Sequence, residues 1–226
     1  MDSKPLDSAG VYKLEHTSSG EPYIALTTRS ETPIYLTKYY PKDPPDVEAA
    51  LSLPEVNFFL ISAPTPYTLA DAEWWVNSQL ATSSNYPLQI LRAGAPDESG
   101  TLIGSVSLMP PDSAVLATLR EKGILPDSHP NGKECELGYY LRPDYRGKGI
   151  VKAGVKGILA YGKVEHGVTN VLIRVADDNE ASLRVVENMG KEYWVRTEQE
   201  DHVVDWPEAK GGGRKNLLSW RWMAPS

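Results

Sequence analysis

The stretch RPDYRGKGIVKAG, residues 142–154, lies between an apolar run and a helical pattern. The preceding run, Leu137–Leu141, reads as a buried strand, and a proline ends it. The first N–H groups of a helix have no acceptors within the helix, and the macrodipole makes this end positive. Gly147 and Gly149 lack side chains, so a ligand can approach the backbone, and the arginine and lysine beside them add positive charge. The stretch therefore predicts a site for a phosphate or pyrophosphate group.

Two common phosphate-binding motifs do not fit this stretch. A nucleoside-triphosphate loop needs Gly-x-x-x-x-Gly-Lys-Ser/Thr, but Lys148 is followed by Gly149. A dinucleotide-binding turn needs Gly-x-Gly-x-x-Gly, but Lys152 stands where the third glycine is required. Taken alone, the stretch could also be a glycine-rich turn with solvated basic residues.

The length and charge of the chain limit the classes of protein that it can belong to. Its 226 residues suffice for one large α/β domain or two small ones. The 30 acidic and 23 basic residues give a net charge of −7, which argues against nucleic-acid binding because such binding needs a basic face. Without an internal repeat or a long linker, we expect one domain over residues 1–226, with a core at about 23–223 and an N-terminal extension over 1–20.

The cysteine count, the histidine spacing and the lengths of the apolar runs exclude further classes of protein. Cys135 is the only cysteine, so an intramolecular disulfide and a thiolate-rich metal site are excluded. The four histidines lack the spacing of zinc ligands, and we expect no metal. The N-terminus lacks the apolar stretch of a signal peptide, and no run approaches the roughly 18 apolar residues of a membrane span. We therefore expect a cytoplasmic protein that neither spans nor binds a membrane.

The pattern of strands and helices is clearest in the middle of the chain. Strands at Glu136–Leu141 and Val171–Val175 flank a helix from about Gly149 to His166, which predicts a parallel pair inside a mixed sheet. Thr68 and Asp71 can form a capping box at the start of an earlier helix. The other expected elements are strands at Tyr23–Thr28 and Ile34–Tyr39, a helix at Asp46–Leu53, a hairpin of Leu88–Ala93 and Thr101–Leu108, a helix at Glu180–Met189, and a strand pair at Tyr193–Thr197 and Leu217–Met223.

Three motifs together resemble a known family. Arg146-Gly-Lys-Gly-Ile-Val151 resembles the Arg/Gln-x-x-Gly-x-Gly/Ala signature of the GNAT superfamily of acyl-CoA-dependent N-acyltransferases. Glu136-Leu-Gly-Tyr-Tyr-Leu141 and Asn179-Glu-Ala-Ser182 fall in the order and spacing of its ribosomal-protein-alanine-acetyltransferase-like branch, and Thr68–Trp75 resembles that branch's early helix. The likeness covers roughly Ile34 to Val195.

The chain departs from the family pattern at three places. Val151 stands where the superfamily usually has Gly or Ala, and Lys152-Ala-Gly154 replaces an acidic residue often found early in this helix. Met189-Gly-Lys191 replaces the common Leu-Gly-Phe. These departures leave the substrate class open more than they affect cofactor binding.

The resemblance implies a GNAT-like α/β fold, with a mixed, mostly antiparallel sheet flanked by helices and one parallel strand pair that splays apart. Acetyl-CoA would lie in the wedge between Glu136–Leu141 and Val171–Val175. Asn179 would bond the pantetheine arm, although asparagine there is also a common helix N-cap. The residues expected to bind the cofactor are Tyr139 and Leu141 through backbone groups, Arg146, Gly147, Lys148, Gly149, Ile150 and Val151 around the pyrophosphate, and Asn179.

The implied reaction is direct attack of a neutral amine on the thioester, which needs a base and an acid near the thiolate. Ser182 lies three residues after Asn179, on the same helix face, and is the candidate acid unless it is a solvated serine. Glu136 is the candidate base, directly or through water, unless it is an ordinary strand-edge carboxylate, and Glu134 is the second candidate. Cys135 faces the other side of the strand and reads as a small buried residue.

The acceptor is less defined. A protein N-terminus, a small amine, an amino acid and an aminoglycoside-like compound all remain open. The segment Met109–Lys133 and the glycine-rich linker near residue 211 would flank the acceptor, and their acidic residues favour a cation unless they are merely solvated. These acidic residues are Asp112, Glu121, Asp127, Asp201, Asp205 and Glu208.

The sequence thus predicts an N-acetyltransferase that acetylates a primary amine of a small molecule or a protein N-terminus. The alternative is a non-catalytic acyl-CoA binding or sensing module. Either a monomer or a homodimer fits the sequence.

Overall fold

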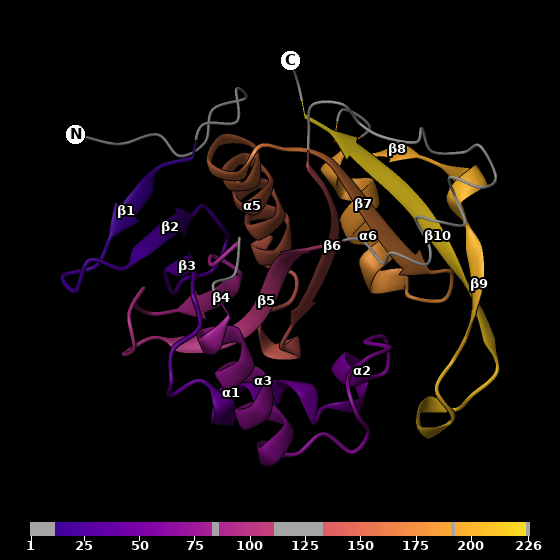
Figure 1. Cartoon of the computed structure of the whole chain (residues 1–226), viewed down its shortest axis with the longest axis horizontal. Coiled ribbons are helices and arrows are strands. Elements are labelled where there is room, and N and C mark those ends of the chain that lie inside the picture. Colours follow the sequence, from indigo (N-terminus) through magenta and orange to yellow (C-terminus); the bar gives the residue numbers. More distant parts are fainter. Residues whose placement is uncertain (1–11, 83–85, 111–132, 191–192, 225–226) are drawn as a thin grey trace. The chain divides into compact units, whose positions relative to one another are not determined.

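The computed structural model in Figure 1 describes residues 12–82, 86–110, 133–190 and 193–224. The chain divides into a first unit, residues 1–107 and 139–162, and a second unit, residues 108–138 and 163–226. The strands β5 (Thr101–Met109) and β6 (Lys133–Leu141) and the helix α5 (Ile150–His166) each have residues in both units. The single domain expected for residues 1–226 stays a prediction.

The first unit contains an antiparallel sheet. Its strands are β1 (Leu14–His16), β2 (Pro22–Leu26), β3 (Ile34–Thr37), β4 (Ile90–Ala93) and β5 (Thr101–Met109), each antiparallel to the next. The end of β6 follows β5 in the sheet, and Arg142 N donates to Ile103 O at 2.9 Å just beyond it. The expected early strands and the hairpin of β4 and β5 are confirmed, whereas β1 was not expected.

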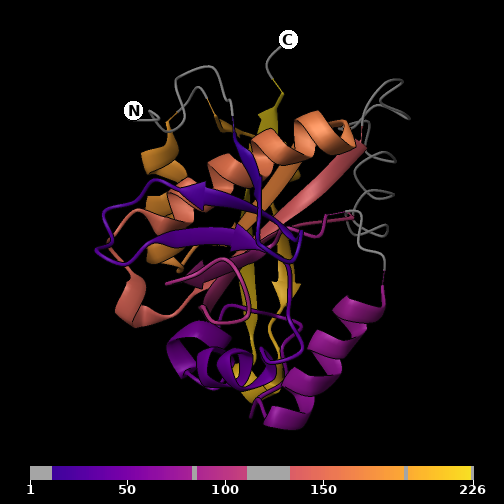
Figure 2. The same ribbon diagram turned by 90° about the vertical axis from the view of Figure 1, so that its left-hand side faces the viewer.

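The helix α5 covers one face of this sheet (Figure 2). A Cβ added to Gly157 would lie 3.3 Å from Leu26, and one added to Gly154 would lie 2.9 Å from Leu91. The two glycines therefore allow the helix to lie close to β2 and β4. The helix begins and ends close to where the sequence predicted it.

Three helices pack on the opposite face of the sheet: α1 (Pro44–Leu51), α2 (Pro54–Asn57) and α3 (Leu69–Ala81). Ile90 packs with these helices while its neighbour Leu91 meets α5, as the alternation of side chains along a strand requires. Figures 1 and 2 show α1 and α3 side by side. The buried cluster consists of Tyr39, Val47, Leu51, Val56, Tyr67, Ala72, Val76, Ile90 and Leu102.

The expected capping box at the start of α3 is present. The Thr68 hydroxyl accepts from Asp71 N, and the Asp71 carboxylate accepts from Thr68 N at 2.9 Å. These two contacts satisfy backbone donors that the first turn of a helix leaves unpaired, and they fix where α3 begins.

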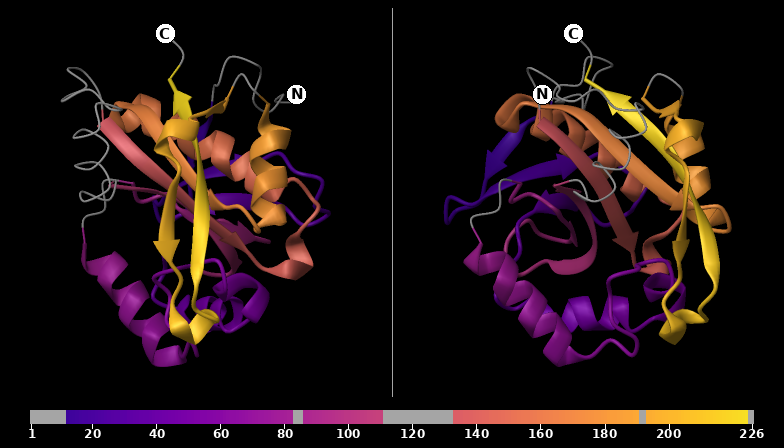
Figure 3. Two further views of the ribbon diagram at one scale, coloured as in Figure 1. Left: turned by 90° about the vertical axis from the view of Figure 1, so that its right-hand side faces the viewer. Right: turned by 45° about the vertical axis from the view of Figure 1, so that its right-hand side comes forward.

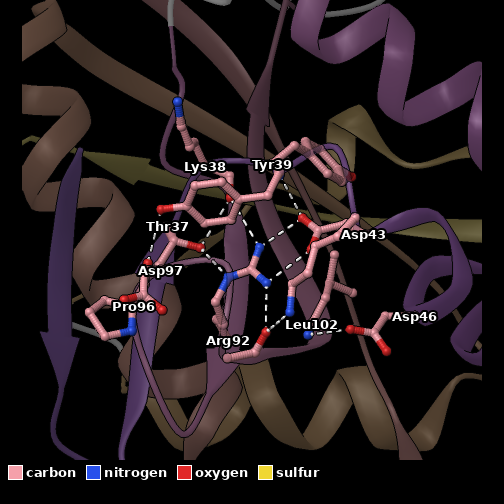
Figure 4. Close-up of polar contacts among 12 residues, drawn as sticks. Thr37, Lys38, Tyr39, Asp43, Asp46, Arg92, Pro96, Asp97 and Leu102 are labelled. Atoms are coloured by element: carbon pink, nitrogen blue, oxygen red, sulfur yellow. Dashed lines mark hydrogen bonds and ion pairs between the residues drawn. The ribbon is translucent and has the colours of Figure 1, made fainter. Parts of the chain in front are cut away.

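A buried ion pair joins β4 to the start of α1 (Figure 4). The Arg92 guanidinium donates to both carboxylate oxygens of Asp43, at 2.9 and 2.7 Å, and neither side chain is exposed. Arg92 also donates to Thr37 Oγ1 at 3.1 Å and to Gly100 O at 3.1 Å, and Asp43 accepts from Tyr40 N at 2.8 Å. These contacts compensate the burial of both charges and fix the entry into α1.

The second unit contains the parallel strand pair. The first residues of β6, Lys133–Glu136, run parallel to β7 (Val168–Ala176). The last strand, β10 (Arg214–Met223), pairs antiparallel with β7, β8 (Val195–Arg196) and β9 (His202–Asp205). The described sheet is therefore mostly antiparallel with one parallel pair, as the resemblance implied, and the splay of that pair stays a prediction.

The glycine-rich segment near residue 211 is more ordered than a linker. It contains β9, a 3-10 turn at Glu208–Lys210, and three glycines with positive φ (Gly211, Gly212 and Gly213) that lead into β10. Figure 3 shows β9 and β10 as neighbouring strands. The sequence analysis expected a linker here, so this hairpin was not predicted.

The helix α6 (Glu180–Met189) confirms the prediction for this segment. Val186 and Met189 are buried, while the opposite side of the helix is polar. Gly190 ends the helix at φ 94°, a conformation that favours glycine.

Candidate functional site

The loop between β6 and α5 lies in the first unit and begins with a 3-10 turn, Pro143–Tyr145. Gly147 and Gly149 follow it with φ of 77° and 76°, in the left-handed region that favours glycine. A Cβ added to either glycine would meet no atom within 4 Å. The backbone conformation, and not crowding, therefore requires glycine here, and the space beside both residues is open to a ligand.

The start of α5 presents amide groups without backbone acceptors. Ala153 N donates to Gly149 O at 3.0 Å and closes the first turn of the helix. Within the described part of the chain, no backbone hydrogen bond uses the N–H groups of Gly147, Gly149, Ile150 or Val151. The first turn has no acidic residue. Amide donors and a positive macrodipole at one place form the kind of site that binds an anion.

The two predicted cations of the loop also help to shape it. Arg146 is exposed, and its Nη2 donates to Glu55 O at 3.2 Å. Lys148 donates from Nζ to Asp144 O at 3.1 Å and lies 5.2 Å from the ring centroid of Tyr145. Backbone oxygens of Glu55 and Asp144 therefore hold the two cationic side chains.

A third cation, Arg29, reaches the loop from the connection between β2 and β3. Its backbone N donates to Lys148 O at 2.9 Å, and its Nη2 donates to Gly147 O at 2.9 Å. Nothing in the sequence indicates this role, because Arg29 lies 118 positions from Gly147 and in no motif. Its exposed guanidinium adds to the positive charge of the predicted phosphate site.

Tyr139 and Leu141, whose backbone groups were expected to bind the cofactor, lie at the end of β6 in the first unit. Leu141 is buried beside Gly104 of β5, and Tyr139 is half-buried. The strand thus leads directly into the glycine loop, and the role of the two backbone groups stays a prediction.

Asn179 and Ser182 lie together at the start of α6 in the second unit. Asn179 is the N-cap, and its Oδ1 accepts from Ser182 N at 3.2 Å. The N-cap interpretation is therefore confirmed. This bond uses the oxygen of the carboxamide, and Nδ2 has no partner among the described residues. Nδ2 can therefore donate to a ligand while Oδ1 caps the helix.

Glu136, the candidate base, is held by an arginine that no sequence motif indicated. Arg174 of β7 donates from Nε to Glu136 Oε1 at 2.7 Å and from Nη2 to Oε2 at 2.5 Å. The side chains are 12% and 17% exposed, so the pair is largely shielded. The paired register of β6 and β7 ends at Glu136 and Leu172. Glu136 therefore lies at the end of the parallel ladder.

Glu134, the second candidate, is also paired. It accepts from Arg221 Nη1 at 2.5 Å, and Arg221 donates from Nε to Glu200 Oε1 at 2.6 Å and from Nη1 to Asn170 Oδ1 at 2.8 Å. Burial alone would lower the pKa of Arg221, but its hydrogen bonds with Glu200 and Glu134 raise it overall. Glu134 therefore belongs to a largely buried network of ion pairs and hydrogen bonds.

Cys135 is 1% exposed and lies opposite Val171 in the register of β6 and β7. It is a small buried residue, as predicted.

The acidic residues predicted near the acceptor differ in their surroundings. Asp112, Glu121 and Asp127 lie outside the described residues. Asp201 forms an ion pair with Arg196 and accepts from Ser219 N at 2.8 Å. Asp205 and Glu208 are exposed, and Asp205 lies 3.9 Å from Arg214 Nε. A preference for a cation stays a prediction that rests on Asp205 and Glu208 in the described residues.

The described residues contain no group of three or more His, Cys, Asp and Glu side chains that could hold a metal ion. Among the helices of these residues, none has both the length and the apolar character needed to cross a membrane.

Comparisons with known proteins identify the family and the fold of the chain. The family model "Acetyltransferase (GNAT) domain" matches residues 34–192. No curated protein matches the chain. An acetyltransferase of the GNAT family from Bacillus anthracis is similar in structure, with a TM-score of 0.59 and 16% identity over 88% of this chain and 98% of that one.

Two other solved structures are also similar. The microcin C7 self-immunity acetyltransferase MccE, in complex with acetyl-CoA and AMP, has a TM-score of 0.58 and 16% identity over 86% of this chain and 94% of that one. A ribosomal-protein-alanine N-acetyltransferase from Brucella melitensis has a TM-score of 0.54 and 17% identity over 84% of this chain and 99% of that one. At these identities the likeness shows the fold.

Proposed function

Because the chain belongs to the GNAT acetyltransferase family, we propose that it transfers the acetyl group of acetyl-CoA to a primary amine by direct attack of that amine on the thioester. The family match runs through residues of both units, which supports treating the chain as one such domain.

The glycine loop carries this proposal. The amides from Gly147 to Val151 lack backbone acceptors in the described chain. Arg146 and Lys148 add positive charge within the loop, and Arg29 adds a third cation through its hydrogen bond to Gly147 O. A pyrophosphate carries negative charge and offers several acceptor oxygens, so it fits both features. Acetyl-CoA contains such a group and supplies an activated acetyl thioester.

The start of α6 would supply polar groups for the rest of the cofactor. Asn179 would donate from Nδ2 to a carbonyl of the pantetheine arm while its Oδ1 continues to cap the helix. Ser182 would donate its hydroxyl proton, or a hydrogen bond, to the departing thiolate. Its backbone N–H is the group that the cap uses, so the hydroxyl can do this without disturbing the cap.

Glu136 would accept the proton of the attacking amine, directly or through one water molecule. A carboxylate has about four lone-pair sites, and the fork of Arg174 occupies one on each oxygen. The remaining sites could accept from an amine, and the fork of Arg174 would hold the carboxylate in one orientation for this transfer. A cationic acceptor agrees with the exposed carboxylates of Asp205 and Glu208.

A panel of amines tests the proposal. Release of free thiol from acetyl-CoA should accelerate with at least one member, and that amine should gain the mass of one acetyl group. Replacing Ser182 by Ala should slow turnover by about a hundredfold, within the range for loss of a proton donor, and leave CoA affinity unchanged. Binding of CoA without acetylation of any amine in a panel of peptides, amino acids, small amines and aminoglycosides would contradict the proposal.

A further inference from the structure

One face of the sheet in the second unit carries a connected set of charged side chains. Glu136 and Leu172 are register partners in β6 and β7, and Arg174 projects to the same face two residues later. Arg174 donates to the Glu136 carboxylate from Nε and Nη2, and its Nη1 lies 3.1 Å from His202 Nε2. His202 begins β9 and pairs with Leu217 of β10. Arg174 thereby links His202, 28 positions further along the chain, to the candidate base Glu136.

The partners of His202 determine its protonation state. A guanidinium has only donors, so Nε2 must accept the hydrogen bond from Arg174 and carries no proton. Nδ1 lies 3.3 Å from the backbone oxygen of Glu200, which is an acceptor, so Nδ1 carries the proton. The arrangement therefore requires a neutral imidazole in the Nδ1–H form.

Most of the surrounding charges are paired. The charged groups on the elements around His202 are Lys133, Glu134 and Glu136 of β6, Arg174 of β7, Arg196 of β8, Glu198 and Glu200 before β9, Asp201 and Asp205 beside and within β9, and Arg214, Lys215 and Arg221 of β10. Lys133 and Glu198 are exposed, and Asp205 lies 3.9 Å from Arg214 Nε. Glu136 pairs with Arg174, Glu134 and Glu200 with Arg221, Asp201 with Arg196, and Lys215 with Asp178. In this arrangement Arg174 is the charged group that contacts the ring of His202.

We propose that His202 is a positioning residue for acetyl transfer, which in its neutral form holds Arg174 against Glu136 and on protonation releases it. This inference rests on the proposed role of Glu136 as the proton acceptor. A proton on Nε2 would remove the acceptor of Arg174 and place an imidazolium beside a guanidinium. Arg174 must then turn away, or Glu136 must exchange one cation for the other, and either movement displaces the carboxylate.

The consequence is a loss of activity as pH falls. Histidine is the common side chain that gains a charge on mild acidification. Because Nε2 accepts from Arg174, protonation of His202 ends the arrangement that orients Glu136. A misplacement of about 1 Å in a catalytic group reduces rates by about a hundredfold.

The first test needs no activity. In protein labelled with nitrogen-15, the imidazole nitrogens of His202 should show the Nδ1–H tautomer at the upper end of a pH titration. His202→Gln identifies the signals by their loss. On acidification the Arg174 Nε–H signal should shift with the same midpoint as the His202 ring. An Nε2–H tautomer, or an Arg174 signal that ignores the protonation of His202, overturns the proposal.

The second test is the pH profile of acetyl transfer. A glutamine at position 202 offers an amide oxygen to Arg174 and does not titrate, so His202→Gln should keep its kcat at low pH while the native enzyme loses about tenfold or more. His202→Leu offers no acceptor and should be slowed at every pH. The matched control is His16→Gln, an exposed histidine of β1, whose profile should equal that of the native protein. An acid limb that persists unchanged in His202→Gln overturns the proposal.

The two tests separate this inference from the proposed function. If no amine is acetylated, the proposed function fails, and the tautomer with the linked Arg174 signal still decides whether His202 positions the pair. If acetylation occurs and the tautomer is Nε2–H, the positioning role fails alone.

Discussion

The guanidinium of Arg29 donates a 2.9 Å hydrogen bond to the backbone oxygen of Gly147, a residue 118 positions further along the chain. The backbone N of Arg29 bonds the next carbonyl in the same loop. Arg29 therefore does two things: it fixes the conformation of the glycine loop, and it brings a positive charge to the open amides at the start of α5.

Replacing Arg29 by Ala should weaken CoA binding about tenfold, because a hydrogen bond from a charged group contributes about 1.5–3 kcal/mol and tenfold corresponds to about 1.4 kcal/mol. Calorimetric titration with CoA measures the change. The control is Lys13→Ala, which removes the same charge from a side chain that is 76% exposed. Equal affinity of the two variants would mean that Arg29 does not take part in the phosphate site.

Gly149 should not tolerate a side chain. Its φ of 76° costs an L-residue about 1–2 kcal/mol, and no atom lies within 4 Å of an added Cβ. Gly149→Ala should therefore lower the free energy of unfolding by about 1 kcal/mol and also weaken CoA binding, because the loop must shift or the methyl group must meet the phosphate. Urea unfolding and calorimetry measure the two effects.

Gly20 provides a matched control for this variant. It has φ of 84° in the turn between β1 and β2, and a Cβ there would also meet no atom within 4 Å. Gly20→Ala should lose a similar amount of stability while its CoA affinity stays at the native value. A loss of CoA affinity in both variants would attribute the effect to stability and not to the loop.

The features that the sequence predicted well have strong local signals. The capping box of Thr68 and Asp71 spans four residues, and α6 is bounded by Asn179 at its start and Gly190 at its end. The loop at Gly147 and Gly149 was likewise recognisable from adjacent residues. In each case the physical cause lies within a few positions of the chain.

The contacts that the sequence did not reveal join distant positions. Glu136 is 38 residues from Arg174, and Arg92 is 49 residues from Asp43. A lone charge in a strand has the same sequence signature whether it is solvated or paired, so the partners become visible only when the register of the sheet is known. The role of Glu136 could be suggested from its position, but its fork with Arg174 could not.

The buried pair of Arg92 and Asp43 should dominate the stability of the first unit. Arg92→Met leaves the carboxylate of Asp43 buried without its cation, and we expect the free energy of unfolding to fall by about 3–5 kcal/mol. Urea unfolding followed by circular dichroism measures the loss. The double variant Arg92→Met with Asp43→Leu should recover part of it, because no charge is then left unpaired.

Recovery in the double variant should remain incomplete. Asp43 also accepts from Tyr40 N at 2.8 Å, and leucine leaves this buried donor without its acceptor. A double variant no more stable than Arg92→Met alone would contradict the assignment of the loss to an unpaired charge.

Asn179 allows its two expected roles to be separated. Aspartate keeps an oxygen that accepts from Ser182 N, and its charge is favourable at a helix N-terminus, so Asn179→Asp should keep the stability of α6. It loses the Nδ2 donor, however, and CoA affinity should fall about tenfold, because an acceptor on the pantetheine arm then meets a carboxylate instead of an amide. Asn179→Ala should lose the same affinity and also about 1 kcal/mol of stability with the cap. Calorimetry and urea unfolding of both variants give the comparison. If Asn179→Asp binds CoA with native affinity, Asn179 caps the helix and does not bind the cofactor.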